Sequence, residues 1–169
     1  VASYQPPANV TPISEGQSME EMLANGDLDA AIGVMMQHEN IKTLIDNPFD
    51  AALGAVRDHG IYPVNHLMVV RDDLLAEKPE LAAQIFDLFA RSKSLYLAQL
   101  RGGKIAEPTK IDEVHLAVDP ILGDPLPYGI APNELVLETL VRHARNQKII
   151  RNPVDIKSLF APACHDLVG

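Results

Sequence analysis

Cysteine is nearly absent from this chain, with Cys164 as its single example among 169 residues. One thiol excludes an internal disulfide and the paired cysteines of common zinc frameworks. The sequence also has no HExxH motif, so no metal site is expected. A lone cysteine favours a reducing cytoplasm, with the periplasm as the alternative if a signal peptide precedes this sequence.

Positive charge is scarce as well, because 14 Lys and Arg face 23 Asp and Glu and leave a net charge of −9. Nucleic acids and anionic membranes both require clustered cations, so neither is an expected partner. No apolar run approaches the length of a membrane span, so no membrane insertion is expected. A local basic pocket for an acidic small molecule stays compatible with this balance.

The chain lacks tryptophan and has few aromatic residues, so its core must be aliphatic. Its apolar and charged fractions are those of a globular domain, and its length suffices for one core. Ser18 and Glu21 form a capping box that predicts a helix ending at Asn25-Gly26. The apolar segment 28–34 then predicts a buried parallel strand, which makes half of a βαβ unit.

The stretch 57–100 organises the rest of the sequence. Its apolar run 64–70 predicts a second strand, and Pro79 predicts the start of a long helix that ends at Gly102-Gly103. Further helices are expected over 50–58, 111–118, from Pro132 onward, and over 155–160. Helical spacing predicts that two sets face inward: Leu81, Ile85, Leu88, Phe89 and Tyr96 in the long helix, and Leu135, Val136, Leu140, Val141 and Ala144 in the later one.

Four segments together resemble the 4,5-dihydroxyphthalate decarboxylase family: GDLDAAIGV, GIYPVNHLMVVRDDL, DPLPYGIAPNELVLETLVRHARNQ and DIKSLFAP. That family is related to the type II periplasmic substrate-binding proteins, which are two-lobed α/β sandwiches. The resemblance implies that this chain corresponds to the C-terminal half of such a protein. Residues 1–60 would end the second lobe, and residues 61–169 would form the hinge crossover and the returning part of the first lobe. The missing N-terminal half of the same protein would then be one of its partners.

The resemblance implies a lyase that converts 4,5-dihydroxyphthalate to protocatechuate and CO2 without an organic cofactor. The ligand, a small aromatic or organic acid, would lie in the cleft between the lobes. The first alternative is a binding protein that captures a small organic ligand for an ABC-type transporter. The second is a ligand-sensing domain attached to a DNA-binding module. An exposed apolar surface left by a missing half also makes a homodimer one of the expected states.

Decarboxylation needs a proton donor, hydrogen bonds to the ring hydroxyls, and cations that hold the carboxylates. His66, just before the second predicted strand, is the first candidate for the acid, and His59 is the second. Tyr62 and Asn65 are candidates for binding the ring oxygens. For each of these residues, ordinary packing or turn formation is the competing interpretation.

Arg71 and Arg57 are candidates for holding a carboxylate. Arg71 has a competing interpretation, an ion pair with Asp72, Asp73 or a neighbouring lobe. His38 and Glu39 follow the first predicted strand, where open α/β sheets bind ligands, so they complete the set of substrate-binding candidates. These assignments come from chemistry and position, and no catalytic residue is carried over from the family.

Overall fold

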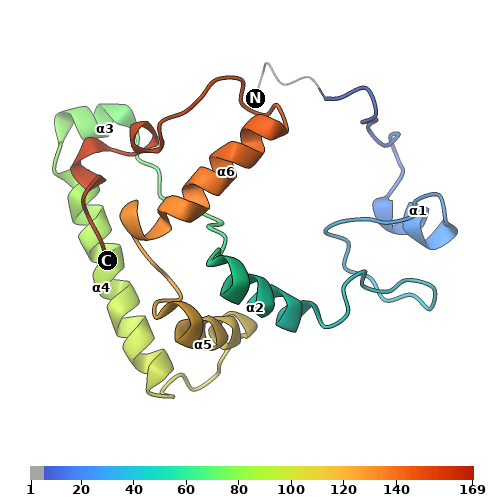
Figure 1. Ribbon diagram of the computed structural model, residues 1–169, viewed down its shortest axis with the longest axis horizontal. Helices are drawn as coiled ribbons and strands as arrows, with labels where there is room; N and C mark the ends of the chain where they lie inside the picture. The colour runs from blue at the N-terminus through green and yellow to red at the C-terminus, as the bar shows by residue number, and fades with distance from the viewer. Residues whose placement is uncertain (1–5) are drawn as a thin grey trace. The chain divides into compact units, whose positions relative to one another are not determined.

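The computed structural model describes residues 6–169, and within that range the chain forms helices but no strand (Figure 1). It divides into two compact units, Val1–Ala51 and Ala52–Gly169, which are described separately below. The α-helices are α1 (Met19–Asn25), α2 (Pro48–His59), α3 (Asp72–Glu77), α4 (Leu81–Arg101), α5 (Lys110–Leu122) and α6 (Glu134–Asn146). Three short 3₁₀ helices are η1 (Ala131–Asn133), η2 (Ile156–Leu159) and η3 (Pro162–Cys164).

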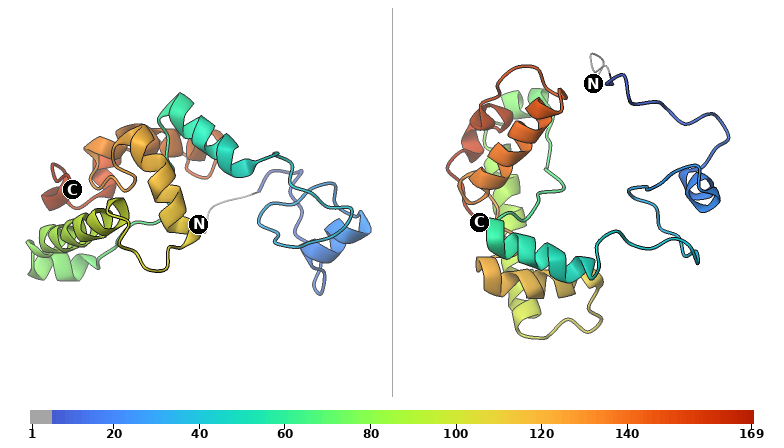
Figure 2. Two further views of the ribbon diagram at one scale, coloured as in Figure 1. Left: turned by 90° about the horizontal axis from the view of Figure 1, so that it is seen from below. Right: turned by 45° about the vertical axis from the view of Figure 1, so that its right-hand side comes forward.

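Neither of the two predicted strands forms within residues 6–169. Residues 28–34 and 64–70 are irregular or extended, and neither view in Figure 2 draws an arrow in the described part. The bridge between His38 and Ile41 is isolated from any strand. A strand needs a neighbour that pairs with its backbone N–H and C=O groups, and the described residues supply none for these segments. The structure is therefore mostly helical, and the predicted two-lobed α/β sandwich is not confirmed.

The predicted helix starts and stops are largely confirmed. In α1 the Ser18 hydroxyl accepts the Glu21 N–H at 3.1 Å, and Gly26 ends the helix at a φ of 81°. The long helix α4 ends at Gly102 as expected, although it begins at Leu81 rather than at Pro79. The sequence prediction missed α3, a six-residue helix that follows Arg71.

The predicted inward faces are only partly correct. Leu88 and Phe89 of α4 are exposed, and so are Leu135 and Leu140 of α6. The buried residues of α4 are instead Ala82, Lys93, Leu97 and Leu100, and the buried residue of α6 is Leu137. Helical periodicity identifies an apolar stripe, but only a packed neighbour decides which part of that stripe is covered.

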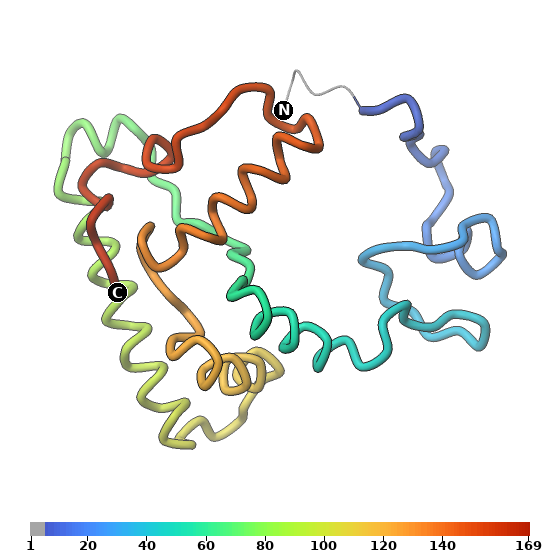
Figure 3. Tube along the Cα trace, viewed as in Figure 1, coloured from blue at the N-terminus to red at the C-terminus, as the bar shows by residue number. Residues whose placement is uncertain are grey.

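The second unit has its own core around α4. Helix α4 contacts α3, α5 and η3, and Val118 of α5 and Pro125 are its fully buried large side chains. Residues 165–169 return along α4 (Figure 3), where Tyr128 and Gly169 exchange two backbone hydrogen bonds of 3.0 and 3.2 Å. Gly129 is required at this approach because its φ is +109° and an added Cβ would collide with the Leu167 carbonyl oxygen.

The first unit has no such core. None of the residues 6–51 is buried. Ile32, Met35 and Leu44 are each 96% exposed, although apolar side chains of this size normally stabilise a fold by leaving water. These residues therefore contribute little hydrophobic stabilisation to the first unit.

Candidate functional site

The strongest polar cluster of the second unit joins α4 to α5. The Tyr96 hydroxyl of α4 lies 2.6 Å from Asp112 Oδ1 and 2.8 Å from His115 Nδ1, both on α5. The Tyr96 and His115 rings meet edge to face, with centroids 5.7 Å apart. Asp112 and His115 are buried, and they share one face of α5 because they are three residues apart. We call Tyr96, Asp112 and His115 the Tyr96 cluster.

Local helix formation holds Asp112 in place. Thr109 is the N-cap of α5, and its side chain and that of Asp112 form a reciprocal capping box. Asp112 Oδ2 accepts the Thr109 backbone N–H at 2.6 Å and the Thr109 hydroxyl at 2.7 Å. The same carboxylate therefore caps its own helix and also accepts a hydrogen bond from the Tyr96 hydroxyl of α4.

The cluster shifts the pKa of each member. Hydrogen bonds from Tyr96 and Thr109 lower the pKa of Asp112 to about 2. Burial, with a smaller contribution from Asp112, raises the pKa of Tyr96, so its hydroxyl stays protonated across the physiological range. Burial lowers the pKa of His115, and the nearby Asp112 charge offsets part of that effect. At neutral pH the cluster thus holds a carboxylate, a phenol and a neutral imidazole.

Tyr62 is a predicted site residue that affects this cluster. It makes a small contribution to the raised pKa of Tyr96, and burial raises the pKa of Tyr62 itself. For the other members of the predicted polar group, no interaction with the cluster is found among the described residues. His59 ends α2, while Asn65 and His66 are exposed on the extended segment 61–70, and the side chains of these three make no hydrogen bond within residues 6–169.

The predicted arginines and the residues of the first unit have other surroundings. Arg71 donates to Asp73 from Nε at 2.9 Å, so its predicted ion pair with a neighbouring aspartate is confirmed. Arg57 is exposed near the end of α2. In the first unit, His38 Nδ1 accepts the Asn40 N–H at 3.3 Å, and Glu39 is exposed in the same turn. A ligand role for these four residues stays a prediction.

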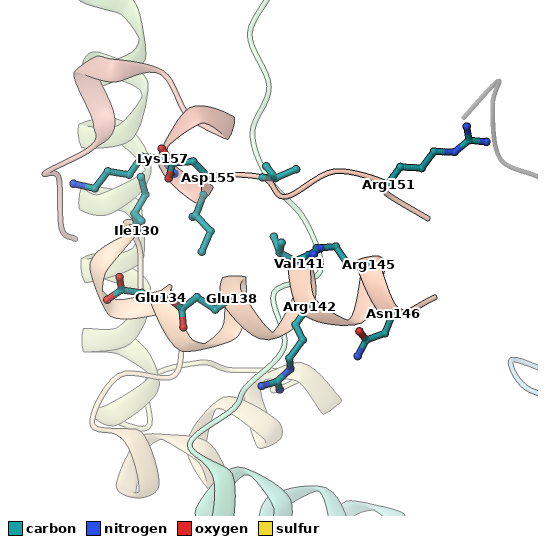
Figure 4. A pocket seen from close by; sticks show the side chains of 12 residues that line it. Ile130, Glu134, Glu138, Val141, Arg142, Arg145, Asn146, Arg151, Asp155 and Lys157 are labelled. Carbon is teal, nitrogen blue, oxygen red and sulfur yellow. The ribbon is translucent and has the colours of Figure 1, made fainter. Parts of the chain in front are cut away.

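A groove of about 650 Å³ lies between α6 and residues 151–157. Figure 4 shows that Arg142 and Asn146 of this groove are directed away from the 151–157 segment. These two side chains therefore do not converge with the other polar groups of the groove on one point, as a site for a carboxylate would require. We therefore take the Tyr96 cluster, and not this groove, as the candidate site.

Two further properties limit what the described residues can do. No three His, Cys, Asp or Glu side chains between residues 6 and 169 come close enough to hold a metal ion. No helix in the same range has the length and apolar composition that a membrane crossing would need. Cys164 is a half-buried free thiol, and burial raises its pKa, which keeps it in the unreactive thiol form.

The sequence analysis missed Asp112 and His115. Tyr96 was expected to face inward, but its polar partners were not identified. A signal was present in TKIDEVH, residues 109–115, where a capping Thr is followed by Asp and His at helical spacing. Their pairing with Tyr96 depends on the packing of α5 against α4, which no local pattern reveals.

No family model matches the chain. The chain is similar to a curated protein of Comamonas testosteroni named 4,5-dihydroxyphthalate decarboxylase, with 25% identity over 158 residues. The match covers 88% of this chain and 48% of the relative, so the chain spans about half the length of the protein it matches. This distant similarity gives weak support to the family resemblance and is compatible with a decarboxylase-like activity.

Proposed function

We propose that this chain belongs to a carboxy-lyase that acts on an aromatic dicarboxylate such as 4,5-dihydroxyphthalate and forms protocatechuate and CO2. The observation that carries the proposal is the similarity to the Comamonas testosteroni protein along 88% of the chain. In this reaction the carbon that loses the carboxylate gains a proton, and charge develops on the ring oxygens. Side chains that donate and accept protons therefore provide the required chemistry.

His66 is the proposed acid, with His59 as the second choice. Tyr62 and Asn65 would bind the ring oxygens. His66 and Asn65 lie on the same extended segment and are both exposed, so they are accessible to a ligand. Tyr62 is half-buried and lies near enough to Tyr96 to contribute to the raised pKa of Tyr96.

The carboxylates need cations, for which Arg71 and Arg57 are the proposed residues. Arg71 is already paired with Asp73, so the ligand would have to compete with that exposed ion pair. An exposed ion pair stabilises little because water and salt screen it, so a two-pronged carboxylate contact can replace it. His38 and Glu39 are the residues proposed from the first unit.

We further propose that the complete protein has the two-lobed α/β architecture, with residues 64–70 as one of its strands. Within the described residues the backbone N–H and C=O groups of this segment make no hydrogen bond. Leu67, Met68 and Val69 are 58, 61 and 85% exposed. An extended apolar segment with free backbone groups has the properties of a strand without its neighbours. The chain also matches only about half of its relative, which leaves room for those neighbours in the rest of that protein.

The test is CO2 release from 4,5-dihydroxyphthalate by the protein expressed from its complete reading frame. Replacing His66 with Gln should lower turnover by about 100-fold or more, because general acids contribute about 10²–10⁴ to rate. The matched control is His143→Gln, an exposed histidine on α6 that should not affect turnover. Unchanged turnover in His66→Gln would remove His66 as the acid.

A wild-type protein that binds aromatic acids in a thermal-shift screen but releases no CO2 would contradict the lyase proposal. That result would favour a binding protein with the same architecture.

A further inference from the structure

Two side chains compete for the single proton of the Tyr96 hydroxyl. Asp112 Oδ1 lies 2.6 Å from Tyr96 Oη, and His115 Nδ1 lies 2.8 Å from the same oxygen. A phenol donates one hydrogen bond and accepts others. The side chain that accepts the hydrogen bond from the Tyr96 hydroxyl therefore decides which nitrogen of His115 carries a hydrogen.

Asp112 receives it. Its other oxygen, Oδ2, accepts two hydrogen bonds from Thr109, which stabilise the ionised form. With its pKa held at about 2, Asp112 is an acceptor only at neutral pH. Tyr96 thus donates to Asp112, and its oxygen is left to accept a bond from His115.

His115 must then carry its hydrogen on Nδ1 and keep the lone pair on Nε2. Every buried side-chain nitrogen or oxygen of the described residues has a hydrogen-bond partner, while the hydrogen bond of His115 is made through Nδ1. Nε2 makes no hydrogen bond among the described residues and is therefore not fully enclosed, although His115 as a whole is only 8% exposed. The edge-to-face contact with Tyr96 holds the ring in this orientation.

We propose that His115 Nε2 is a preset proton acceptor for a phenolic hydroxyl of the substrate, with Tyr96 and Asp112 as positioning residues. This inference rests on the proposed function and adds a residue to it. The phenolic O–H bond breaks, an N–H bond forms at Nε2, and the freed electron pair moves into the ring. The ring carbon takes a proton from the acid, the bond to the carboxylate breaks, and CO2 leaves. His115 then returns its proton to the phenolate, so one proton is consumed overall.

The tautomer is the first test, and it needs no turnover. In ¹⁵N spectra of the full chain, His115 should carry its hydrogen on Nδ1. Tyr96→Phe removes the oxygen that accepts this hydrogen, so the preference for Nδ1 should be lost. Tyr62→Phe removes a neighbouring hydroxyl without touching His115 and should leave the tautomer unchanged. A wild-type His115 with its hydrogen on Nε2 would overturn the proposal, even if Tyr96→Phe fails to fold.

Catechol, which has the ring hydroxyls but no carboxylate, is the second probe. Its addition should shift the ¹⁵N resonance of His115 Nε2, and an unchanged resonance at saturating catechol would contradict the proposal. In the protein from the complete reading frame, His115→Gln should lower kcat by about 100-fold or more, with a much smaller change in KM. If the wild type releases no CO2, the proposed function fails, while the tautomer and catechol experiments still decide the role of His115.

Discussion

Lys93 is a buried cation whose partner is only partly buried, and this asymmetry predicts unequal effects of removing each side chain. Its Nζ lies 2.6 Å from Asp124 Oδ2 and 2.6 Å from the Gly169 carbonyl oxygen. It also lies 5.1 Å from the centroid of the Tyr128 ring. The Lys93 side chain is 6% exposed, whereas that of Asp124 is 35% exposed.

Replacing Asp124 with Asn leaves the ammonium group of Lys93 buried without its counter-charge. Loss of one partner of a buried pair costs about 3–5 kcal/mol, and the partial exposure of Asp124 places the expected loss near the lower limit, about 3 kcal/mol. Asn keeps an oxygen for the Leu126 N–H, which Asp124 Oδ1 accepts at 2.9 Å, so this turn is preserved.

Replacing Lys93 with Met removes the buried charge itself and keeps the apolar stem. The remaining carboxylate of Asp124 reaches solvent and still accepts the Leu126 N–H. The expected loss is therefore smaller, about 1–2 kcal/mol. The double variant should have a free energy of unfolding close to that of Lys93→Met alone, because without Lys93 the Asp124→Asn change leaves no buried charge unpaired.

The assay is urea unfolding of the full chain, followed by circular dichroism, with the free energy taken from the midpoint and the slope. Asp124→Asn should have the lowest midpoint of the three variants at an unchanged slope. If Lys93→Met is as destabilising as Asp124→Asn, or if the double variant equals the sum of the two single losses, the argument from burial is wrong.

Three further predictions concern α5 and the glycine turns. Thr109→Ala should destabilise the chain by about 0.5–2 kcal/mol in thermal unfolding, because it removes the N-cap of α5, whereas Thr109→Ser should be near wild type. The pKa of Asp112 is about 2 in the folded chain and lies below the ordinary value of 3.8, so its stabilisation is present above pH 3.8 and is lost as the pH falls through 2. In Asp112→Asn the urea midpoint should change less between pH 5 and pH 2 than it does in the wild type. The same pH dependence in both proteins would contradict the assignment. Gly129→Ala should lower the melting temperature more than Gly123→Ala, because both need positive φ but only the first places a Cβ against the Leu167 carbonyl.

The helices were largely predictable because their signals are local. Ser18, Gly26 and Gly102 mark helix ends through bonds and backbone angles that involve only neighbouring residues. The strands were not predictable in this way, because an apolar run such as 64–70 indicates an extended, buried segment but does not identify the segment that would pair with it. Without a pairing segment in the described chain, residues 64–70 stay extended and exposed.

The candidate site shows the same limit. Tyr62 was singled out from sequence, and in the structure it contributes to the raised pKa of Tyr96. Asp112 and His115 were missed, since each looks like an ordinary helix residue until α5 packs on α4. The ion pair of Arg71 with Asp73 was among the expected alternatives because it joins residues two apart.

By itself the sequence determined where most helices begin and end, that no internal disulfide forms, and that the chain resembles half of a decarboxylase. These properties depend on composition and on neighbours within a few residues. Tertiary structure alone decided which apolar stripe is covered, that Lys93 is buried against Asp124, and that Tyr96, Asp112 and His115 meet. Contacts between distant segments arise from packing, and the free energy of packing depends on surfaces that local spacing does not specify.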